Sequence, residues 1–315
     1  MTRARIIVIG CVVAAALVAP AMGRDGLEGY AGVKLCAACH KKSDEQIVQK
    51  QPLSAHGAAL WAVDDKGPAH KVLGDFGADA GFAQADVAYV VGKGVRAQAY
   101  LGAELNALPK EWWVASKQWE PVPAGEPKKS CLGCHTTGYD PATGKWSDPG
   151  VTCEACHGAG SSHAKSKDKL ASIGRPQELP AERQAMICGR CHARGSNPDG
   201  LPFALGFKPG DDLAQSFKLD ATWEPGSRYS QYNDFANSKH LAQGVVCSTC
   251  HDPHGVRSGQ PYQLHKPADE LCLDCHKAPL AGDQHSPPQN CAGCHMPKGS
   301  HQFEKPQAAS ASGAG

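Results

Sequence analysis

Apolar residues occur along this chain in short runs, and only one run is long. Residues 6–18 form an uninterrupted apolar stretch of 13 residues near the N-terminus. Further along, residues 86–94 have the pattern of a short strand, and a helix is predicted from about Lys41. Between such runs Gly (35 residues) and Pro (23 residues) are frequent. The pattern therefore predicts many turns and few long regular elements.

The long apolar stretch has the surroundings of a secretory signal. Arg3 and Arg5 precede it, and small residues follow it as far as Ala21 and Gly23. This order predicts a signal peptide over residues 1–23, with cleavage after Gly23 or Ala21. A 13-residue stretch is too short to span a bilayer. We therefore expect an exported protein, periplasmic or extracellular, with no transmembrane segment after cleavage.

Composition and charge narrow the possible functions. Hydrophobic residues make up 41% of the chain but aromatic residues only 6%. A large all-protein core is therefore unexpected, and another group is needed to fill the interior. The formal charge is +1, which becomes −1 once the two arginines of the predicted signal peptide are removed. A chain this close to neutral lacks the excess of basic residues that is typical of nucleic-acid-binding proteins.

The cysteines follow a single pattern. Of 15 cysteines, Cys11 lies in the predicted signal peptide, and the other 14 form seven Cys-x-x-Cys-His units. The paired cysteines are Cys36 and Cys39, Cys131 and Cys134, Cys153 and Cys156, Cys188 and Cys191, Cys247 and Cys250, Cys272 and Cys275, and Cys291 and Cys294.

Three other uses of paired cysteines compete with haem attachment. Exported proteins form disulfides, zinc ribbons use two Cys-x-x-Cys pairs, and redox dithiols use one. None of these requires a histidine directly after the second cysteine. Chance placement of histidine in all seven units has a probability on the order of 10⁻⁹ under an unrelated-motif hypothesis. Haem attachment therefore explains the pattern best.

The chemistry of haem c accounts for the spacing. Two sulfurs form thioethers to one edge of the porphyrin, and the adjacent histidine supplies the fifth iron ligand. The chain is thus predicted to carry seven covalently attached haem c groups. Their proximal ligands are His40, His135, His157, His192, His251, His276 and His295.

Eight further histidines are candidates for the sixth iron ligand, because imidazole is a preferred haem ligand. Six of them are favoured: His56, His163, His240, His254, His285 and His301. Two are less strongly indicated, His70 and His265, and one of these could be a bystander. Met186 and Met296 are expected to pack rather than to ligate. Mostly bis-histidine ligation follows, and it favours low reduction potentials.

The units divide the mature chain unevenly. We expect one multihaem domain over residues 24–304, with a haem-poor part at 41–130 and a haem-rich part at 131–304. Within the haem-poor part, residues 108–113 end in two tryptophans and are expected to pack as a lid on neighbouring haems. The low-complexity tail at 305–315 is predicted to be disordered.

Three segments resemble a known group of proteins. They begin at Glu28 (EGYAGVKLCAACHK), Cys131 (CLGCHTTGY, continued by GVTCEACHGAGSSH from Gly150) and Ser238 (SKHLAQGVVCSTCHDPHG). They are similar to the cytochrome c-554-like multihaem cytochromes with doubled motifs. The resemblance implies a mainly α fold with extensive coil and few short strands, organised around stacked haem pairs. It also implies distal roles for His56, His163, His240, His254, His285 and His301.

Electron transfer through an array of mostly bis-histidine haems is the predicted function. The predicted partners are redox proteins, such as quinol-linked or outer-membrane cytochromes. An alternative is a multihaem oxidoreductase that acts on nitrogen or sulfur oxyanions or on hydroxylamine at one five-coordinate haem. A second alternative is a subunit of an extracellular cytochrome filament. The sequence specifies neither an oligomeric state nor catalytic residues.

Overall fold

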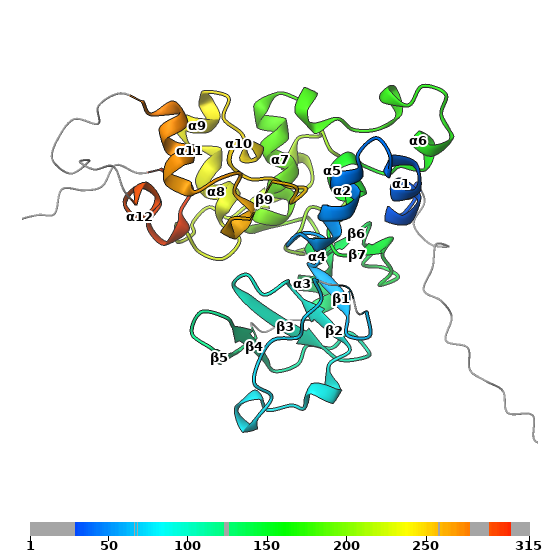
Figure 1. The fold of residues 1–315 in the computed structure, drawn as a ribbon, viewed down its shortest axis with the longest axis vertical. Coiled ribbons are helices and arrows are strands. Elements are labelled where there is room, and N and C mark those ends of the chain that lie inside the picture. Colours follow the sequence, from blue (N-terminus) through cyan, green and yellow to red (C-terminus); the bar gives the residue numbers. More distant parts are fainter. Residues whose placement is uncertain are drawn as a thin grey trace, which may run out of the picture.

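The fold combines a layer of short helices with one small sheet (Figure 1). The computed structural model describes residues 29–65, 67, 69–122, 126–257, 259–277 and 290–303. The predicted signal peptide, His285 and the predicted tail lie outside these residues. In the described part, no helix is both long enough and apolar enough to cross a membrane.

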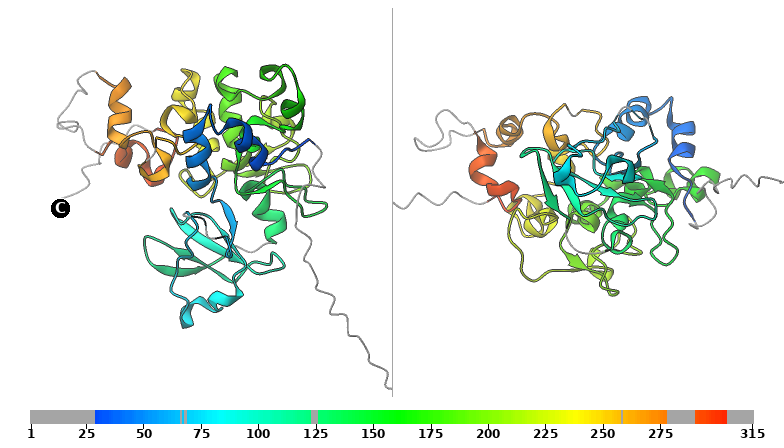
Figure 2. Two further views of the ribbon diagram at one scale, coloured as in Figure 1. Left: turned by 45° about the vertical axis from the view of Figure 1, so that its right-hand side comes forward. Right: turned by 90° about the horizontal axis from the view of Figure 1, so that it is seen from below.

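The helices are short because glycine, proline and the Cys-x-x-Cys-His units interrupt them. The first six are α1 (Val33–His40), α2 (Glu45–Lys50), α3 (Pro127–Ser130), α4 (Leu132–His135), α5 (Cys153–His157) and α6 (Ser161–Lys165). The others are α7 (Ala181–His192), α8 (Gln231–Ala236), α9 (Lys239–Ala242), α10 (Cys247–Cys250), α11 (Ala268–Cys275) and α12 (Cys291–His295). Figures 1 and 2 place α1 and α12 at opposite ends of the helical layer.

A five-stranded antiparallel sheet occupies most of the haem-poor part. Its strands pair in chain order: β1 (Leu60–Ala62), β2 (Tyr89–Val91), β3 (Ala97–Leu101), β4 (Lys110–Trp113) and β5 (Gln118–Pro121). Two small antiparallel pairs lie among the helices: β6 (Thr136–Thr137) with β7 (Asp148–Pro149), and β8 (Gly195–Ser196) with β9 (Lys218–Leu219).

The two faces of the sheet pack against different groups. Leu60 is buried in a cluster with Leu132, which belongs to α4. The next residue, Trp61, is buried in a separate cluster with Val90 and Tyr100. Because successive strand residues point to opposite faces, one face covers α4 and the other contains an aromatic cluster of its own.

A third apolar cluster holds the helical layer together. It is centred on α7 and α8 and includes the buried side chains of Ile187, Phe207, Tyr232 and Phe235. Cys156 and Cys247 pack against its edge. The cluster therefore joins three Cys-x-x-Cys-His units: the units of Cys156 and Cys247, and the unit at the end of α7.

An ion pair links the sheet to the helical part. Glu111 on β4 accepts two hydrogen bonds of 3.0 Å from the guanidinium of Arg228. The Glu111 side chain is only 6% exposed. The same guanidinium lies 5.7 Å from the ring centroid of Trp113. A bidentate pair in this setting fixes the orientation of both partners.

The expected fold class is confirmed, with one difference in the haem-poor part. The structure is mainly helical with extensive coil, and its strands are short. The strand predicted in residues 86–94 is β2, and the helix predicted from Lys41 begins at Glu45. The five-stranded sheet was not predicted, and residues 108–113 contribute its fourth strand. Their role as a lid on haems stays a prediction.

Candidate haem-binding sites

Each Cys-x-x-Cys-His unit lies in one turn of helix or at its end. In chain order we call the units motif one to motif seven; they belong to α1, α4, α5, α7, α10, α11 and α12. Helical positions i, i+3 and i+4 are neighbours on one face. The two sulfurs and the imidazole of each unit therefore project from the same side of the backbone, as attachment to one porphyrin requires.

The motif helices pack against one another in a defined order. α1 packs on α5, α7 packs on both α4 and α10, and α11 packs on α12. Cysteines of different motifs lie close together at all four contacts: Cys36 near Cys153, Cys134 near Cys191, Cys188 near Cys247, and Cys272 near Cys291.

Motif three and motif four are joined as well, since Arg190 donates a 3.0 Å hydrogen bond to the carbonyl oxygen of Ala155. Motif four thus contacts motifs two, three and five, and motif three also contacts motif one.

Among the described residues, five motif histidines face a histidine from outside the motifs. The ring centroids are 6.1–6.2 Å apart in all five pairs. The pairs are His40 with His163, His192 with His56, His157 with His254, His276 with His240, and His251 with His301. We call the histidine from outside the motifs the outer histidine of each pair. It lies closer in sequence to another motif than to the motif whose histidine it faces, so each pair links two motifs.

The separation of these rings fits an iron between them. A metal–imidazole bond is about 2 Å long and the ring centroid lies roughly 1 Å further, so two imidazoles on opposite sides of one iron have centroids about 6 Å apart. Rings stacked directly on one another lie closer, as His70 and Trp61 do at 4.8 Å. The angle between the paired rings varies from 7° to 79°. Rotation about the metal–nitrogen bond permits this range.

Hydrogen bonds orient the imidazoles so that Nε2 stays free. Among the motif histidines, Nδ1 of His157 lies 2.9 Å from the carbonyl oxygen of Gly174, and Nδ1 of His251 lies 2.8 Å from that of Tyr262. Among the outer histidines, Nδ1 of His163 lies 2.9 Å from the carbonyl oxygen of Lys169. When Nδ1 donates to a carbonyl, Nε2 carries the lone pair that binds a metal.

Burial keeps several of these rings neutral. Desolvation lowers the pKa of His192 to about 4, and it also lowers the pKa of its partner His56. The pKa of His135 is lowered for the same reason. A neutral imidazole is the form that coordinates iron. At neutral pH these side chains are therefore in the required protonation state.

His135 of motif two has a different environment. Its Nδ1 lies 3.0 Å from the carbonyl oxygen of Ala59, at the start of β1. In the described ranges, no second histidine ring contacts His135. His70 stacks on Trp61, which points to the opposite face of the sheet from α4.

His265 has a different orientation as well. Its Nε2 is hydrogen-bonded to the carbonyl oxygen of Ser248 at 3.0 Å, and its buried Nδ1 has no partner within the described part.

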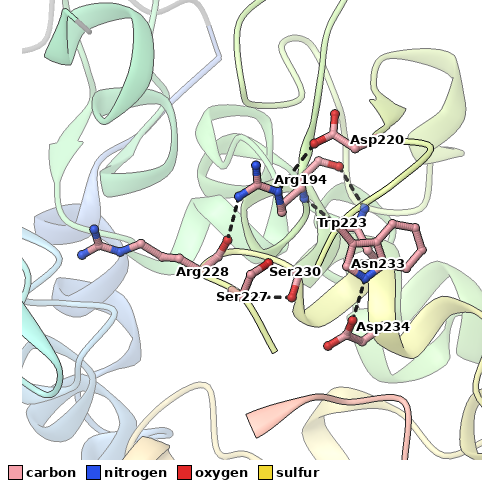
Figure 3. A network of polar contacts seen from close by, with 8 residues as sticks. All are labelled: Arg194, Asp220, Trp223, Ser227, Arg228, Ser230, Asn233 and Asp234. Carbon is pink, nitrogen blue, oxygen red and sulfur yellow. Dashed lines mark hydrogen bonds and ion pairs between the residues drawn. The ribbon is translucent and has the colours of Figure 1, made fainter. Parts of the chain in front are cut away.

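Buried polar side chains hold the segments that carry the histidines. Asn233 both accepts from the backbone N–H of Arg194 at 2.7 Å and donates to the Arg194 carbonyl at 3.0 Å, just beyond motif four (Figure 3). Its neighbour Asp234 accepts hydrogen bonds from Trp223 Nε1 and from the backbone N–H of His301. The two residues therefore position the end of α7 and the segment of His301.

Glu154, inside motif three, has a similar role. Its buried carboxylate accepts hydrogen bonds from the backbone N–H groups of Ala31 and Gly32 at 2.8 Å and of Gly160 at 2.6 Å. These contacts tie the entry to α1 and the turn before α6 to motif three. Sequence reasoning missed Glu154 and the Ala59 carbonyl, because no local pattern distinguishes an x position of the motif or a backbone acceptor.

Comparison with known protein families agrees with the haem-binding geometry. The sequence model of the family "Cytochrome c554 and c-prime" matches residues 103–158, and that of the "Doubled CXXCH motif" matches residues 239–281. Together with the motif helices, these matches identify the chain as a multihaem c-type cytochrome. Haem c is the cofactor that the motifs and these matches support. The c554 match spans motifs two and three, and the doubled-motif match spans motifs five and six.

Two curated relatives share part of their length with this chain. It is 34% identical over 175 residues to the dissimilatory sulfite reductase MccA of Wolinella succinogenes, a match that covers 47% of this chain and 22% of that protein. It is 27% identical over 182 residues to the multiheme cytochrome MtrA of Shewanella baltica, covering 47% and 52%. The chain thus matches about half or less of the length of these relatives.

Two solved structures share the fold. The outer cell wall cytochrome OcwA superposes with a TM-score of 0.68 at 21% identity, covering 88% of this chain and 80% of that one. The undecaheme cytochrome from the S-layer of Carboxydothermus ferrireducens gives a TM-score of 0.55 at 23% identity, covering 88% and 52%.

The Glu154 contacts lead to a prediction about stability. Glu154→Ala leaves three backbone N–H groups without their carboxylate acceptor and should lower the free energy of unfolding by roughly 3 kcal/mol. The measurement is urea unfolding of the haem-loaded protein, followed by circular dichroism. Glu178→Ala, which removes an exposed ion pair with Arg175, is the matched control and should cost less than about 1 kcal/mol. Equal losses in the two variants would contradict the structural role of Glu154.

Proposed function

We propose that the chain binds seven haem c groups, one at each motif, and transfers electrons through them. The observation that carries this proposal is the set of five imidazole pairs at 6.1–6.2 Å. The motif histidine of each pair is the proximal ligand. The distal ligands are His163 for motif one, His254 for motif three, His56 for motif four, His301 for motif five and His240 for motif six. For His285, outside the described residues, the distal role stays a sequence prediction.

The bound haem c groups supply one-electron iron couples. The polypeptide contributes the spacing of the motifs, two neutral imidazoles for most irons and a shell of apolar side chains. Carbonyl acceptors on Nδ1 increase the basicity of the bound imidazoles, and bis-histidine ligation favours low potentials. The contacts of motif four with motifs two, three and five support short steps between neighbouring sites.

Export of the protein is part of the same proposal. The predicted signal peptide at residues 1–23 and the attachment of haem c outside the cytoplasm support it. Two solved structures with this fold come from an outer cell wall and an S-layer. We therefore propose a periplasmic or extracellular site of action, with quinol-linked or outer-membrane cytochromes as redox partners.

Replacing one distal histidine tests the ligand pairs. His163→Ala removes the ring opposite His40, so one haem per chain should change from low spin to high spin. Electron paramagnetic resonance of the oxidised protein measures this change. His70→Ala is the matched control, because His70 stacks on Trp61 and faces no motif histidine among the described residues. This substitution should leave the spin state of every haem unchanged. An unchanged spectrum in the His163 variant would remove His163 from the ligands.

A second candidate function, redox catalysis, is favoured by the environment of motif two. His135 is oriented like the other motif histidines, but no histidine ring in the described ranges contacts it from the other side. An iron bound there would keep one coordination position for a small ligand. Sulfur or nitrogen oxyanions are the substrate class we consider, and one relative that shares 175 aligned residues is a sulfite reductase.

Binding of carbon monoxide separates the two candidates. If motif two has an open position, the reduced wild-type protein should bind about one carbon monoxide per chain, and the oxidised protein should show a high-spin ferric signal. His135→Met should alter that signal and leave the other haems unchanged. A wild-type spectrum that is entirely low spin, together with no carbon monoxide binding, would exclude catalysis at motif two. Electron transfer would then be the only one of the two candidate functions that stands.

A further inference from the structure

Lysines gather around the histidine pair of motif one. Lys34 lies on α1, and Lys41 and Lys42 follow it directly. Lys165, Lys167 and Lys169 follow His163 at the end of α6 and in the next loop. The 6.2 Å separation of the His40 and His163 rings brings these two segments together. All six lysines are exposed; we call them the lysine collar.

The two segments that form the collar carry a net positive charge. Residues 33–45 contain three lysines and two acidic residues, and residues 161–170 contain three lysines and one acidic residue, a net of +3. One ferric haem with two propionates contributes about −1, so roughly +2 remains. By contrast, α11 of motif six carries three acidic residues and no basic one.

Apolar and redox-active groups lie within the collar. Leu35, next to Lys34, is 40% exposed, and Leu170, next to Lys169, is 63% exposed. The side chain of His40 is 47% exposed, and Cys39 is exposed too. Apolar contacts surrounded by lysines fit a partner that has an apolar centre and an acidic rim.

We propose that the lysine collar, with Leu35 and Leu170, is the docking face for an acidic electron-transfer protein. In each encounter the partner gives up one electron, one ferric site of this chain becomes ferrous, and no bond forms or breaks. The proposal rests on the proposed electron-transfer function. It assigns the entry point to motif one, at the end of the helical layer opposite α12 (Figure 2).

The test is the rate of reduction by an acidic flavodoxin, measured by stopped flow on the haem-loaded protein. The collar variant combines Lys42→Glu with Lys167→Glu, one substitution from each segment. The control variant combines Lys117→Glu, in the turn between β4 and β5, with Lys218→Glu on β9; both lysines are exposed. Both variants change the net charge by the same amount, so only the position of the charge differs.

We expect the second-order rate constant of the collar variant to fall about tenfold or more at low ionic strength and to approach the wild-type value at high salt. The control variant should change less than about threefold. Equal effects in both variants, or no effect in the collar variant, would overturn the proposal. It would also be overturned if only binding to phosphatidylglycerol vesicles were lost, because the collar would then recognise a membrane surface.

Two further measurements separate this proposal from the proposed function. Haem content and the rate of reduction by dithionite, a small inorganic reductant, should be unchanged in the collar variant. A lower haem content would instead show that the substitutions disturb haem attachment. A wild-type protein that carries haem but accepts no electrons from either reductant would contradict the proposed function itself.

Discussion

The separation between paired imidazoles is the constraint on which the rest of this structure depends. Paired rings 6.1–6.2 Å apart have the separation that one iron bound to both imidazoles would need. In the proposed coordination both rings bind iron through Nε2, so each Nδ1 needs an acceptor, and backbone carbonyls such as those of Gly174 and Tyr262 lie in place. The short helices and frequent turns follow from the need to bring these groups to many irons within one small domain.

The same constraint explains how so few aromatic residues suffice. The apolar clusters are small and separate, one around α7 and α8 and two on the faces of the sheet. Each outer histidine of a pair brings a segment near one motif to the ring of another, so the proposed coordination would add cross-links that side-chain packing alone would not provide. Buried acceptors such as Glu154 and Asp234 complete the framework by fixing the backbone beside the ligands.

The local part of the site could be read from the sequence, and the long-range part could not. A Cys-x-x-Cys-His unit is defined within five residues, so all seven proximal positions follow from the printed sequence. The partner of His192 is His56, more than a hundred residues away, and only the fold brings them together. The five-stranded sheet was not predicted either, because its strands are three to five residues long. Each strand is too short to show a clear alternation of apolar and polar residues. Similarly, nothing local indicates that His70 stacks on Trp61 rather than facing a motif.

The most direct test of this account is near-infrared magnetic circular dichroism of the fully oxidised protein, scaled to the number of covalently bound haems. We predict at least five bis-histidine low-spin haems per chain out of seven, and none with histidine–methionine ligation. Fewer than five, or haems ligated by methionine, would mean that the paired imidazoles do not share an iron.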